Sequence, residues 1–446
     1  MQLAARNAVA VAVNIPKRVV SASALSRDPL RVAISSKGLG LHQARTIVST
    51  GRTSRPVTAA GRPTTPTSTR FSDIHKRDSG PLSRIPIRAM SSQPSIPSTM
   101  KAILVKDGKG PSDSLYMGEA PVPKPGDDEV LVKIKAFGLN RMDIMQREGN
   151  YPLPPHAPEI MGVEFSGTVV ATNNLKDVEF KVGQEVFGLA VGGAYAEYIK
   201  VPARMVLEKP KELDWIQAAA IPENYLTAFQ ALRTISQLKP GEDVLIHAGA
   251  SGVGLAAIQL AKAFGANKVY VTAGSEEKIQ FCQDIGADKG FNYKAGDWAE
   301  ELAKHTGAKG PSGSVDVIVD FIGAPYFNGN LASLKRDGRM VMLAFMGGAK
   351  VKDSVIAQLL FKRLRIEGST LRSRTVDYQS DLVQGFVQEK GLERLITGSC
   401  SDGGNKSDGA RLVIHKVYDW KDIKQAHDEM EANKNVGKIV ITIDGA

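Results

Sequence analysis

The sequence predicts an α/β chain in which a disordered N-terminal leader precedes two folded domains. The composition of residues 1–99 indicates the leader. Short alternating strands up to about Pro210 indicate a barrel-like β domain, and strand–helix alternation over residues 243–370 indicates a doubly wound parallel sheet. A chain of 446 residues is long enough for two domains with their own cores. We therefore expect four parts, namely the leader at 1–99, the β domain at 100–223, the parallel-sheet domain at 224–370, and a segment at 371–446 that returns to the β domain.

The leader carries the positive charge of the chain. Residues 1–99 are rich in Ser, Thr, Arg and Pro, and they hold 15 Lys and Arg against 3 acidic residues, a net charge of +12. The remaining residues hold 42 basic and 44 acidic side chains, a net charge of −2, so the +10 of the whole chain does not describe the folded part. A nucleic-acid-binding face is therefore not predicted for either domain.

A basic, Ser-rich and acid-poor start is typical of an organelle transit peptide. The alternative is that Met90 or Met100 is the true initiator, because both precede the first strand pattern. A true transit peptide predicts a mitochondrial protein, and a start-site artefact predicts a cytoplasmic one. No apolar run reaches the length of about 18 residues that a membrane-spanning helix needs, so no span is predicted.

The β domain is predicted from strands that alternate apolar and polar residues, as half-buried strands do. The pattern begins at Met100, with Lys101–Lys106 and Glu129–Ala136 as its clearest examples. Gly and Pro separate the later strands, which is typical of an antiparallel or barrel-like arrangement.

The parallel-sheet domain is predicted from apolar strands that alternate with amphipathic helices. The helix after the first strand carries Val253, Ala257, Leu260, Ala261 and Phe264 on one face. The final stretch reads strand, helix, strand, and we expect its last strand, Lys438–Ile443, to rejoin the β domain. The predicted parallel strands are Asp243–His247, Lys268–Ala273, Val315–Phe321, Arg339–Ala344 and Leu364–Glu367.

A glycine-rich turn joins the first parallel strand to its helix. Small residues let the backbone approach a pyrophosphate, and the N-terminus of the helix offers unpaired N–H groups and a partial positive charge. Such a turn inside repeated strand–helix units predicts a dinucleotide site, and the alternative is a tight turn without a ligand. The residues of the turn are Gly249, Ala250, Ser251, Gly252, Val253 and Gly254.

The end of the second parallel strand predicts which dinucleotide binds. NAD sites carry an acidic residue about 20 positions after the glycine turn, which holds the ribose 2′-hydroxyl. Here Gly274 stands at that place, followed by Ser275 and, one helical turn on, Lys278. We therefore predict NADPH, with Glu276 and Glu277 counting against a phosphate unless they point away. Ser275 also suits a plain helix N-cap.

Further cofactor contacts are expected where other parallel strands end, because open α/β sheets bind ligands at that edge. Tyr293 follows a strand-like segment and suits either stacking on the adenine or covering the sheet edge. The other candidates at this edge are Gly323, Phe345, Met346 and Gly347.

No metal site is predicted. Zinc needs nitrogen or sulfur ligands in a tetrahedral array, and the chain holds only two Cys and seven His without ligand spacing. Residues 161–167 read Met-Gly-Val-Glu-Phe-Ser-Gly. Over nearly all of 100–446 the chain resembles the medium-chain dehydrogenase/reductase family, whose zinc members carry Gly-His-Glu here. Val163 replaces the His ligand, and the early Cys ligand and the four-Cys lobe have no counterpart.

The resemblance is strongest to the zinc-free quinone oxidoreductases of that family. It rests on residues 139–147, 218–223, 226–230, 245–254, 359–363, 371–374 and 430–440. The resemblance implies a GroES-like β-barrel catalytic domain, a Rossmann domain that binds NADPH, reduction of quinones, and a homodimer.

The resemblance also implies site residues outside the parallel-sheet edge. Asn140 and Tyr151 are the implied catalytic residues beside the nicotinamide. Asn140 also suits a turn hydrogen bond, and Tyr151 suits a partly buried aromatic. The additional implied cofactor-binding residues are Thr227, Leu371, Arg372, Asn435 and Lys438, with Gly437 between the last two.

The predicted reaction is hydride transfer to a quinone. A quinone needs no metal to polarise it, because reduction makes the ring aromatic, and water or Tyr151 is able to protonate the product. Two alternatives stay open. One is an NADPH-dependent reductase of α,β-unsaturated carbonyls, and the other is an NADPH-binding structural or sensing protein with little turnover.

Overall fold

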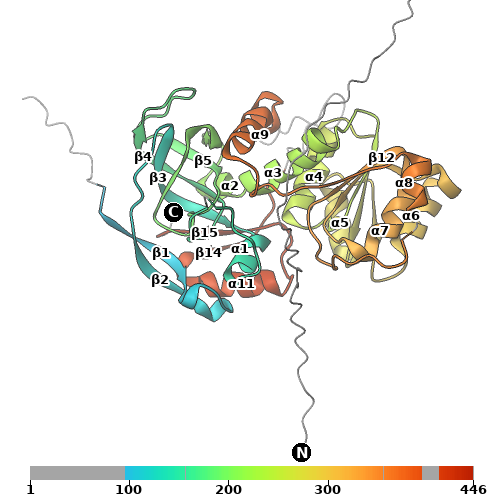
Figure 1. The fold of residues 1–446 in the computed structure, drawn as a ribbon, viewed down its shortest axis with the longest axis horizontal. Helices are drawn as coiled ribbons and strands as arrows, with labels where there is room; N and C mark the ends of the chain where they lie inside the picture. The colour runs from blue at the N-terminus through green and yellow to red at the C-terminus, as the bar shows by residue number, and fades with distance from the viewer. Residues whose placement is uncertain (1–95, 156, 355, 394–410, 445–446) are drawn as a thin grey trace, which may run out of the picture. The chain divides into compact units, whose positions relative to one another are not determined.

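The computed structural model describes residues 96–155, 157–354, 356–393 and 411–444 (Figure 1). Most of the predicted leader lies outside the described residues. So does Gly398–Gly409, which includes Cys400 and which the sequence predicts to be a polar insertion without catalytic residues. The predicted α/β fold class is confirmed, because a barrel-like β domain and a parallel sheet with helices are both present. Within the described residues, none of the helices is long and apolar enough to cross a membrane.

The β domain is built around a sheet in the order β14-β15-β3-β4-β5-β7, with β6 also paired to β3. In β3 the side chains of Val130, Val132 and Ile134 are buried in the core, whereas Lys133 between them is exposed, as the alternating sequence predicts. The strands are β3 (Glu129–Leu139), β4 (Glu164–Asn173), β5 (Glu185–Leu189), β6 (Tyr198–Pro202), β7 (Val206–Glu208), β14 (Ile414–Asp419) and β15 (Lys438–Thr442), beside a hairpin of β1 (Thr99–Val105) and β2 (Leu115–Pro121).

The parallel sheet has the order β10-β9-β8-β11-β12-β13, in which the chain starts in the middle and winds outward in both directions. Val244 and Ile246 of β8 pack into one hydrophobic cluster and Leu245 into another, so the two faces of the sheet are buried by different helices. The strands are β8 (Asp243–Ile246), β9 (Lys268–Ala273), β10 (Lys289–Asn292), β11 (Val315–Asp320), β12 (Leu334–Met342) and β13 (Arg365–Gly368).

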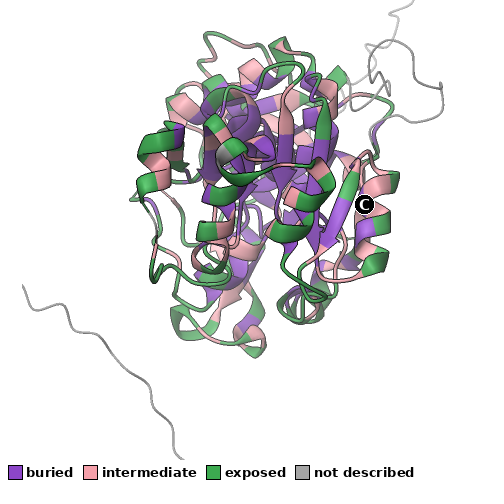
Figure 2. Cartoon of the chain, turned by 90° about the vertical axis from the view of Figure 1, so that its right-hand side faces the viewer, coloured by how far each residue is buried: buried purple, intermediate pink, exposed green. Residues whose placement is uncertain are grey.

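The helices cover these sheets, and Figure 2 shows that the strands are mostly buried while the outer helices alternate buried and exposed residues. Of the expected apolar face of α4, Ala257, Leu260 and Ala261 are buried, as is Phe264 at the C-cap, whereas Val253 is partly buried. Leu255, Ala256 and Ile258 are buried as well, so this helix lies deep in the core. The α-helices are α1 (Arg141–Arg147), α2 (Trp215–Ala219), α3 (Pro222–Phe229), α4 (Gly252–Ala263), α5 (Glu276–Asp284), α6 (Trp298–Thr306), α7 (Phe327–Ser333), α8 (Ala357–Lys362), α9 (Val376–Gln388) and α11 (Ile423–Glu431).

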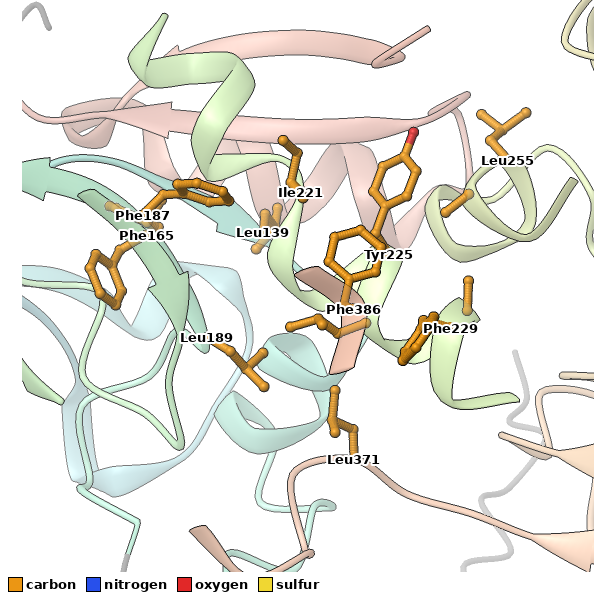
Figure 3. Close-up of a cluster of buried hydrophobic side chains, with 14 of the residues drawn as sticks. Leu139, Phe165, Phe187, Leu189, Ile221, Tyr225, Phe229, Leu255, Leu371 and Phe386 are labelled. Carbon is orange, nitrogen blue, oxygen red and sulfur yellow. The ribbon is translucent and has the colours of Figure 1, made fainter. Parts of the chain in front are cut away.

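An apolar cluster joins the β domain, α3 and the C-terminal segment (Figure 3). The rings of Phe229 on α3 and Phe386 on α9 meet edge to face with their centroids 5.6 Å apart. Phe386 is completely buried, and burial of such a side chain contributes about 1.5–3 kcal/mol of stability. Because Leu371 and Leu189 belong to the same cluster, residues 371–388 are anchored against the β domain.

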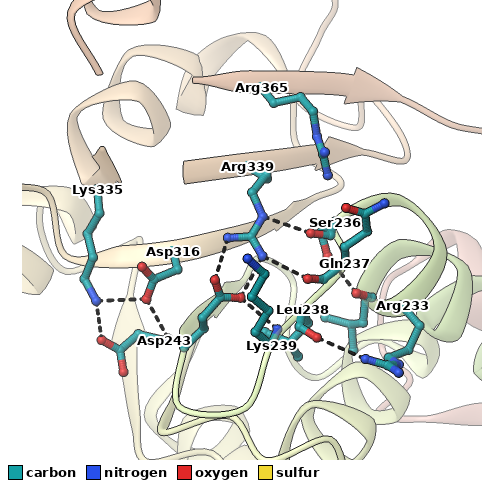
Figure 4. A network of polar contacts seen from close by, with 12 residues as sticks. Arg233, Ser236, Gln237, Leu238, Lys239, Asp243, Asp316, Lys335, Arg339 and Arg365 are labelled. Atoms are coloured by element: carbon teal, nitrogen blue, oxygen red, sulfur yellow. Dashed lines mark hydrogen bonds and ion pairs between the residues drawn. The ribbon is translucent and has the colours of Figure 1, made fainter. Parts of the chain in front are cut away.

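Polar contacts fix the opposite end of α3 to the parallel sheet (Figure 4). A π-helical turn, η4 (Gln230–Ile235), continues α3. Arg339 of β12 donates from Nε to the carbonyl oxygen of Ser236 at 2.9 Å, and its Nη2 lies 2.6 Å from Glu242 Oε2. Lys335 binds Asp243 and Asp316 on the same side, at 2.6 and 2.9 Å. These contacts connect the helix that enters the sheet domain with three of its strands.

The structure corrects several expected elements. β12 begins at Leu334 rather than at residue 339, because Leu334 pairs with Val315 before an irregularity in the register. Residues 335–338 are polar and Asp337 has a positive φ, which conceals this strand in the sequence. The helix α9 lacked a sequence prediction, although Thr375 caps it by accepting from the N–H of Tyr378. The last strand, β15, needs no such correction, because it pairs antiparallel with β3 of the β domain, which the sequence predicts it to rejoin.

Candidate functional site

The glycine-rich turn stands between β8 and α4, as the sequence predicts. Ser251 caps α4, because its Oγ accepts from the N–H of Gly254 at 3.1 Å. A Cβ on Gly249 would lie 2.7 Å from Cβ of Val271, and one on Gly254 would lie 2.5 Å from the oxygen of Ala248. The glycines therefore allow the turn to pack closely, and the first N–H groups of α4 stay available to a phosphate.

The end of β9 carries the residues predicted to select the dinucleotide. Ser275 caps α5 and accepts from the N–H of Lys278 at 3.3 Å, as in an ordinary N-cap. The Nζ of Lys278 donates to the carbonyl oxygen of Asn433 at 3.4 Å. Glu276 accepts from Asn292 Nδ2 at 3.0 Å, so its carboxylate is engaged at the neighbouring strand. Tyr293 is 44% exposed, and its hydroxyl lies over Gly274.

The loops that follow β11 and β12 are joined by backbone hydrogen bonds. The N–H of Met346 donates to Phe321 at 3.0 Å, and that of Gly347 donates to Ile322 at 2.9 Å. Gly323 has a φ of 82°, a conformation that favours glycine, and its N–H donates to the carboxylate of Asp320. Phe345 and Met346 are the exposed members of this edge, at 55% and 58%. These apolar side chains are therefore available to a flat ligand.

Asn140 lies at the centre of a buried polar cluster. It follows β3 and caps α1, and it is 8% exposed. Its Nδ2 donates to Glu164 Oε1 at 2.8 Å, and its Oδ1 accepts from Lys438 Nζ at 2.6 Å. Lys438 also forms an ion pair with the same carboxylate. The second carboxylate oxygen of Glu164 accepts from the N–H of Glu223 at 2.8 Å, so the cluster joins β3, β4, α3 and β15.

Tyr151 lies in the loop after α1, beneath the guanidinium group of Arg372. The guanidinium carbon is 5.4 Å from the ring centroid. Arg372 donates from Nε to Val191 and from Nη1 to Gln146, both at 2.8 Å. Its Nη2 is buried and has no hydrogen-bond partner among the described residues. Burial raises the pKa of Tyr151, and the positive charge of Arg372 opposes that rise.

Two buried carboxyl groups lie close to this cluster and were not predicted as site residues. Burial, followed by the charge of Glu164, raises the pKa of Glu223 to about 7. Burial also raises the pKa of Asp143 to about 6, although this carboxylate accepts from the N–H of Asn140 at 2.8 Å. The sequence offered one sign of these two residues, which is an acidic side chain within an apolar or helix-capping segment. A carboxyl group is rarely buried without a function or a partner.

The remaining predicted cofactor residues differ in what they contact. Thr227 is half-buried, and its hydroxyl donates to Glu223 Oε1 at 3.4 Å. Asn435 donates from Nδ2 to the oxygen of Gly437 at 3.0 Å, which is a local turn contact. Leu371 is buried in the apolar cluster. The N–H of Gly437 donates to the oxygen of Ala250 at 3.3 Å, which brings the C-terminal segment onto the glycine-rich turn.

The residues present fit a nicotinamide dinucleotide but not a zinc ion. Hydrogen-bond donors for the dinucleotide come from the start of α4 after Gly249 and from the unpartnered Nη2 of Arg372. The ends of the parallel strands, near Ser275 and Gly323, leave space for it. For zinc, the side chain at position 163 is a buried valine. Within the part of the chain that is described, no group of three or more His, Cys, Asp or Glu is placed to hold a metal ion.

Comparisons with known proteins agree with this architecture. Residues 126–211 match the family described as alcohol dehydrogenase GroES-like domain, and residues 252–386 match the family described as zinc-binding dehydrogenase. Quinone oxidoreductase of Lama guanicoe is 31% identical over 346 residues, which cover 77% of this chain and 98% of that protein. Human quinone oxidoreductase is 32% identical over 321 residues, which cover 71% of this chain and 94% of that protein.

Solved structures give the same result. A quinone oxidoreductase of Pseudomonas syringae pv. Tomato has a TM-score of 0.65 at 29% identity, covering 77% of this chain and 99% of that one. A mycobacterial protein in complex with NADPH has a TM-score of 0.64 at 29% identity, with the same coverage of 77% and 99%. The CurK enoyl reductase has a TM-score of 0.63 at 28% identity, covering 78% and 100%. With both domains matched and relatives above 30% identity covered almost completely, this chain belongs to the quinone oxidoreductases of the medium-chain dehydrogenase/reductase family.

Proposed function

We propose that this oxidoreductase uses NADPH to reduce quinones by hydride transfer without a metal ion. The observation that carries the proposal is the contact between the two halves of the site. Gly437 donates to the glycine-rich turn at Ala250, and the next residue, Lys438, donates to Asn140. A dinucleotide bound at that turn is therefore held by residues that hydrogen bonds connect, through Gly437 and Lys438, to the candidate catalytic residue Asn140.

When bound, NADPH supplies the hydride, and the protein supplies binding, orientation and a proton donor. We assign the pyrophosphate to the glycine-rich turn, the 2′-phosphate to Ser275 and Lys278, and the adenine to Tyr293. The nicotinamide half is assigned to Thr227, Gly323, Phe345, Met346, Gly347, Leu371, Arg372 and Asn435. Lys438 contacts Asn140 and Glu164 instead, so its part in this site runs through Asn140. We assign to Tyr151 the phenolic proton that the oxygen of the reduced quinone accepts, because a tyrosine hydroxyl is protonated at neutral pH and burial raises its pKa further.

The experiment that tests this function measures oxidation of NADPH and NADH by a panel of quinones. We expect turnover with NADPH and a higher KM for NADH, because the end of β9 offers a lysine and no ribose-binding acid. Equal use of both nucleotides would contradict the assignment of the 2′-phosphate site. No oxidation of NADPH by any quinone would contradict the function itself, and would favour a binding or sensing protein with little turnover.

A second candidate is NADPH-dependent reduction of α,β-unsaturated carbonyls, which uses the same hydride step on a carbon atom. The similarity of the fold to that of the CurK enoyl reductase supports this second candidate. The same assay with an enone panel separates the two, because the better substrate class has the higher kcat/KM.

Metal independence has its own test. Treatment of the purified protein with EDTA should leave quinone reduction unchanged, because Val163 offers no ligand atom. Loss of activity that zinc restores would refute this part of the proposal.

We further propose that the protein is a homodimer that associates through the edge of the parallel sheet at β13. This strand ends the sheet order, and Ile356, Leu360 and Phe361 beside it are 69%, 74% and 71% exposed. Exposed apolar side chains next to an open strand edge suit a second copy of the same sheet. Sedimentation of the wild type and of Phe361→Asp checks this, with a dimer expected for the first and a monomer for the second. A monomeric wild type would refute it.

A further inference from the structure

Lys438 and Glu164 form an ion pair that is almost completely removed from water. Lys438 is 4% exposed and Glu164 is fully buried. Gly138 leaves the space for them, because a Cβ there would collide with Glu164 and would lie 2.7 Å from Cε of Lys438. A buried charge is costly unless it is paired and hydrogen-bonded, and this pair is satisfied by Asn140 and by the N–H of Glu223.

The ion pair determines which way the amide of Asn140 points. An ammonium group only donates and a carboxylate only accepts, so Oδ1 must face Lys438 and Nδ2 must face Glu164. A flipped amide would place its NH₂ group against the ammonium and its oxygen against the carboxylate. The orientation of Asn140 is therefore fixed by two opposite charges that are almost completely buried.

The same lysine is tied to the glycine-rich turn through its neighbour. Gly437 has a φ of 85° and donates to Ala250 at 3.3 Å. A side chain at this position would collide with Val413, so the approach depends on glycine. Lys438 then donates from its own N–H to the oxygen of Val413 at 2.9 Å. Two consecutive residues, Gly437 and Lys438, thus connect the glycine-rich turn to Asn140 through hydrogen bonds.

We propose that Lys438 is a positioning residue for hydride transfer, acting through Asn140, with Glu164 as its fixed counter-charge. This inference rests on the proposed reduction of quinones by NADPH and deepens it. Lys438 holds the amide in one orientation and at one position relative to the glycine-rich turn. It does so without touching the substrate, because its ammonium group is buried and contacts Asn140 and Glu164 inside the protein.

The first variant is Lys438→Met, which keeps the aliphatic chain and removes the ammonium. We expect kcat for quinone reduction to fall about tenfold to hundredfold, since a small misplacement of a reacting group has effects of that order. The dissociation constant for NADPH, measured by fluorescence titration, should change less than about threefold, because the pyrophosphate turn is unaltered. A matched control is Lys209→Met, since Lys209 is also buried beside a carboxylate, Glu185, at 3.0 Å. Its kcat should stay at the wild-type value.

A second variant separates positioning from folding. Lys438→Met alone leaves Glu164 as an unpaired buried charge, whereas Lys438→Met with Glu164→Gln removes both charges. The double variant should recover the wild-type melting temperature and keep the low kcat, because a Gln side chain accepts either orientation of the amide. Recovery of kcat together with stability would overturn the proposal, since the ion pair would then serve folding alone.

A double-mutant cycle tests whether the effect passes through Asn140. In an Asn140→Ala background, Lys438→Met should lower kcat no further, whereas additive losses would overturn the proposal. An active wild type with an equally active Lys438→Met variant would overturn this inference and leave the proposed function intact. A wild type that oxidises NADPH with none of the quinones would instead overturn the proposed function and this inference together.

Discussion

Glu223 provides a quantitative test of the buried cluster, through the stability of the protein rather than its activity. Replacement by Gln removes a carboxyl group whose pKa burial and the charge of Glu164 raise from 4.5 to about 7. The side chain of Gln is close in shape, and its oxygen can accept from the hydroxyl of Thr227 as Glu223 does. The N–H that Glu223 donates to Glu164 belongs to the backbone and is unaffected.

The magnitude follows from the linkage between protonation and folding. Since the folded pKa lies above the unfolded one, the folded chain holds this proton over a range in which the unfolded chain has lost it. The free energy of unfolding therefore falls as pH rises from about 4.5 to about 7, by up to about 3 kcal/mol for this group. Asp143, whose pKa is raised to about 6, adds a fall of the same sign at slightly lower pH in both proteins.

The assay is denaturant unfolding of the wild type and Glu223→Gln at about pH 5 and about pH 8. We expect similar stability at the lower pH and a variant more stable by up to about 3 kcal/mol at the higher pH, where only the wild type also buries the negative charge of Glu223. Glu208→Gln is the control, because Glu208 is exposed and its replacement should matter little at either pH. A difference between wild type and variant that does not change with pH would refute the reasoning.

Four further results are expected. Lys278→Ala should raise KM for NADPH more than KM for NADH in steady-state assays, and equal increases would remove Lys278 from the phosphate site. Tyr151→Phe should lower kcat about tenfold to hundredfold with unchanged NADPH affinity, and an unchanged kcat would exclude the phenol as the proton donor. Phe386→Ala should lower the free energy of unfolding by about 3–5 kcal/mol, which denaturant titration measures, because a fully buried ring is lost. A chain starting at Met90 should keep the quinone activity and NADPH affinity of the full chain, and loss of either would show that the leader contributes to them.

The sequence predicted the elements whose physical signal is local. Strand β9 was expected at Lys268–Ala273 and is found there, because residues of high strand propensity lie between a charged residue and a glycine. The glycine-rich turn was found in the same way, since Gly249 and Ser251 stand between a strand and a helix, and Gly252 and Gly254 lie in the first turn of that helix. β12 was placed too late because the residues after Leu334 are polar, and its pairing with Val315 depends on a partner distant in the sequence.

The polar cluster depends entirely on contacts between distant residues, and this limits what a sequence can reveal. Asn140 and Lys438 were each identified, but 298 positions separate them, and their contact exists only because β15 pairs with β3. Glu164 was read as part of a motif whose metal ligand is missing, and its partner arrives from the last strand. Val163 stands where the zinc members of the family carry a His ligand, and the neighbouring carboxylate of Glu164 is fully buried. That carboxylate needs a cation, because an unpaired charge at full burial is strongly destabilising. Lys438 is that cation, and through it the last strand of the β domain contacts Asn140, the residue on which the proposed reaction depends.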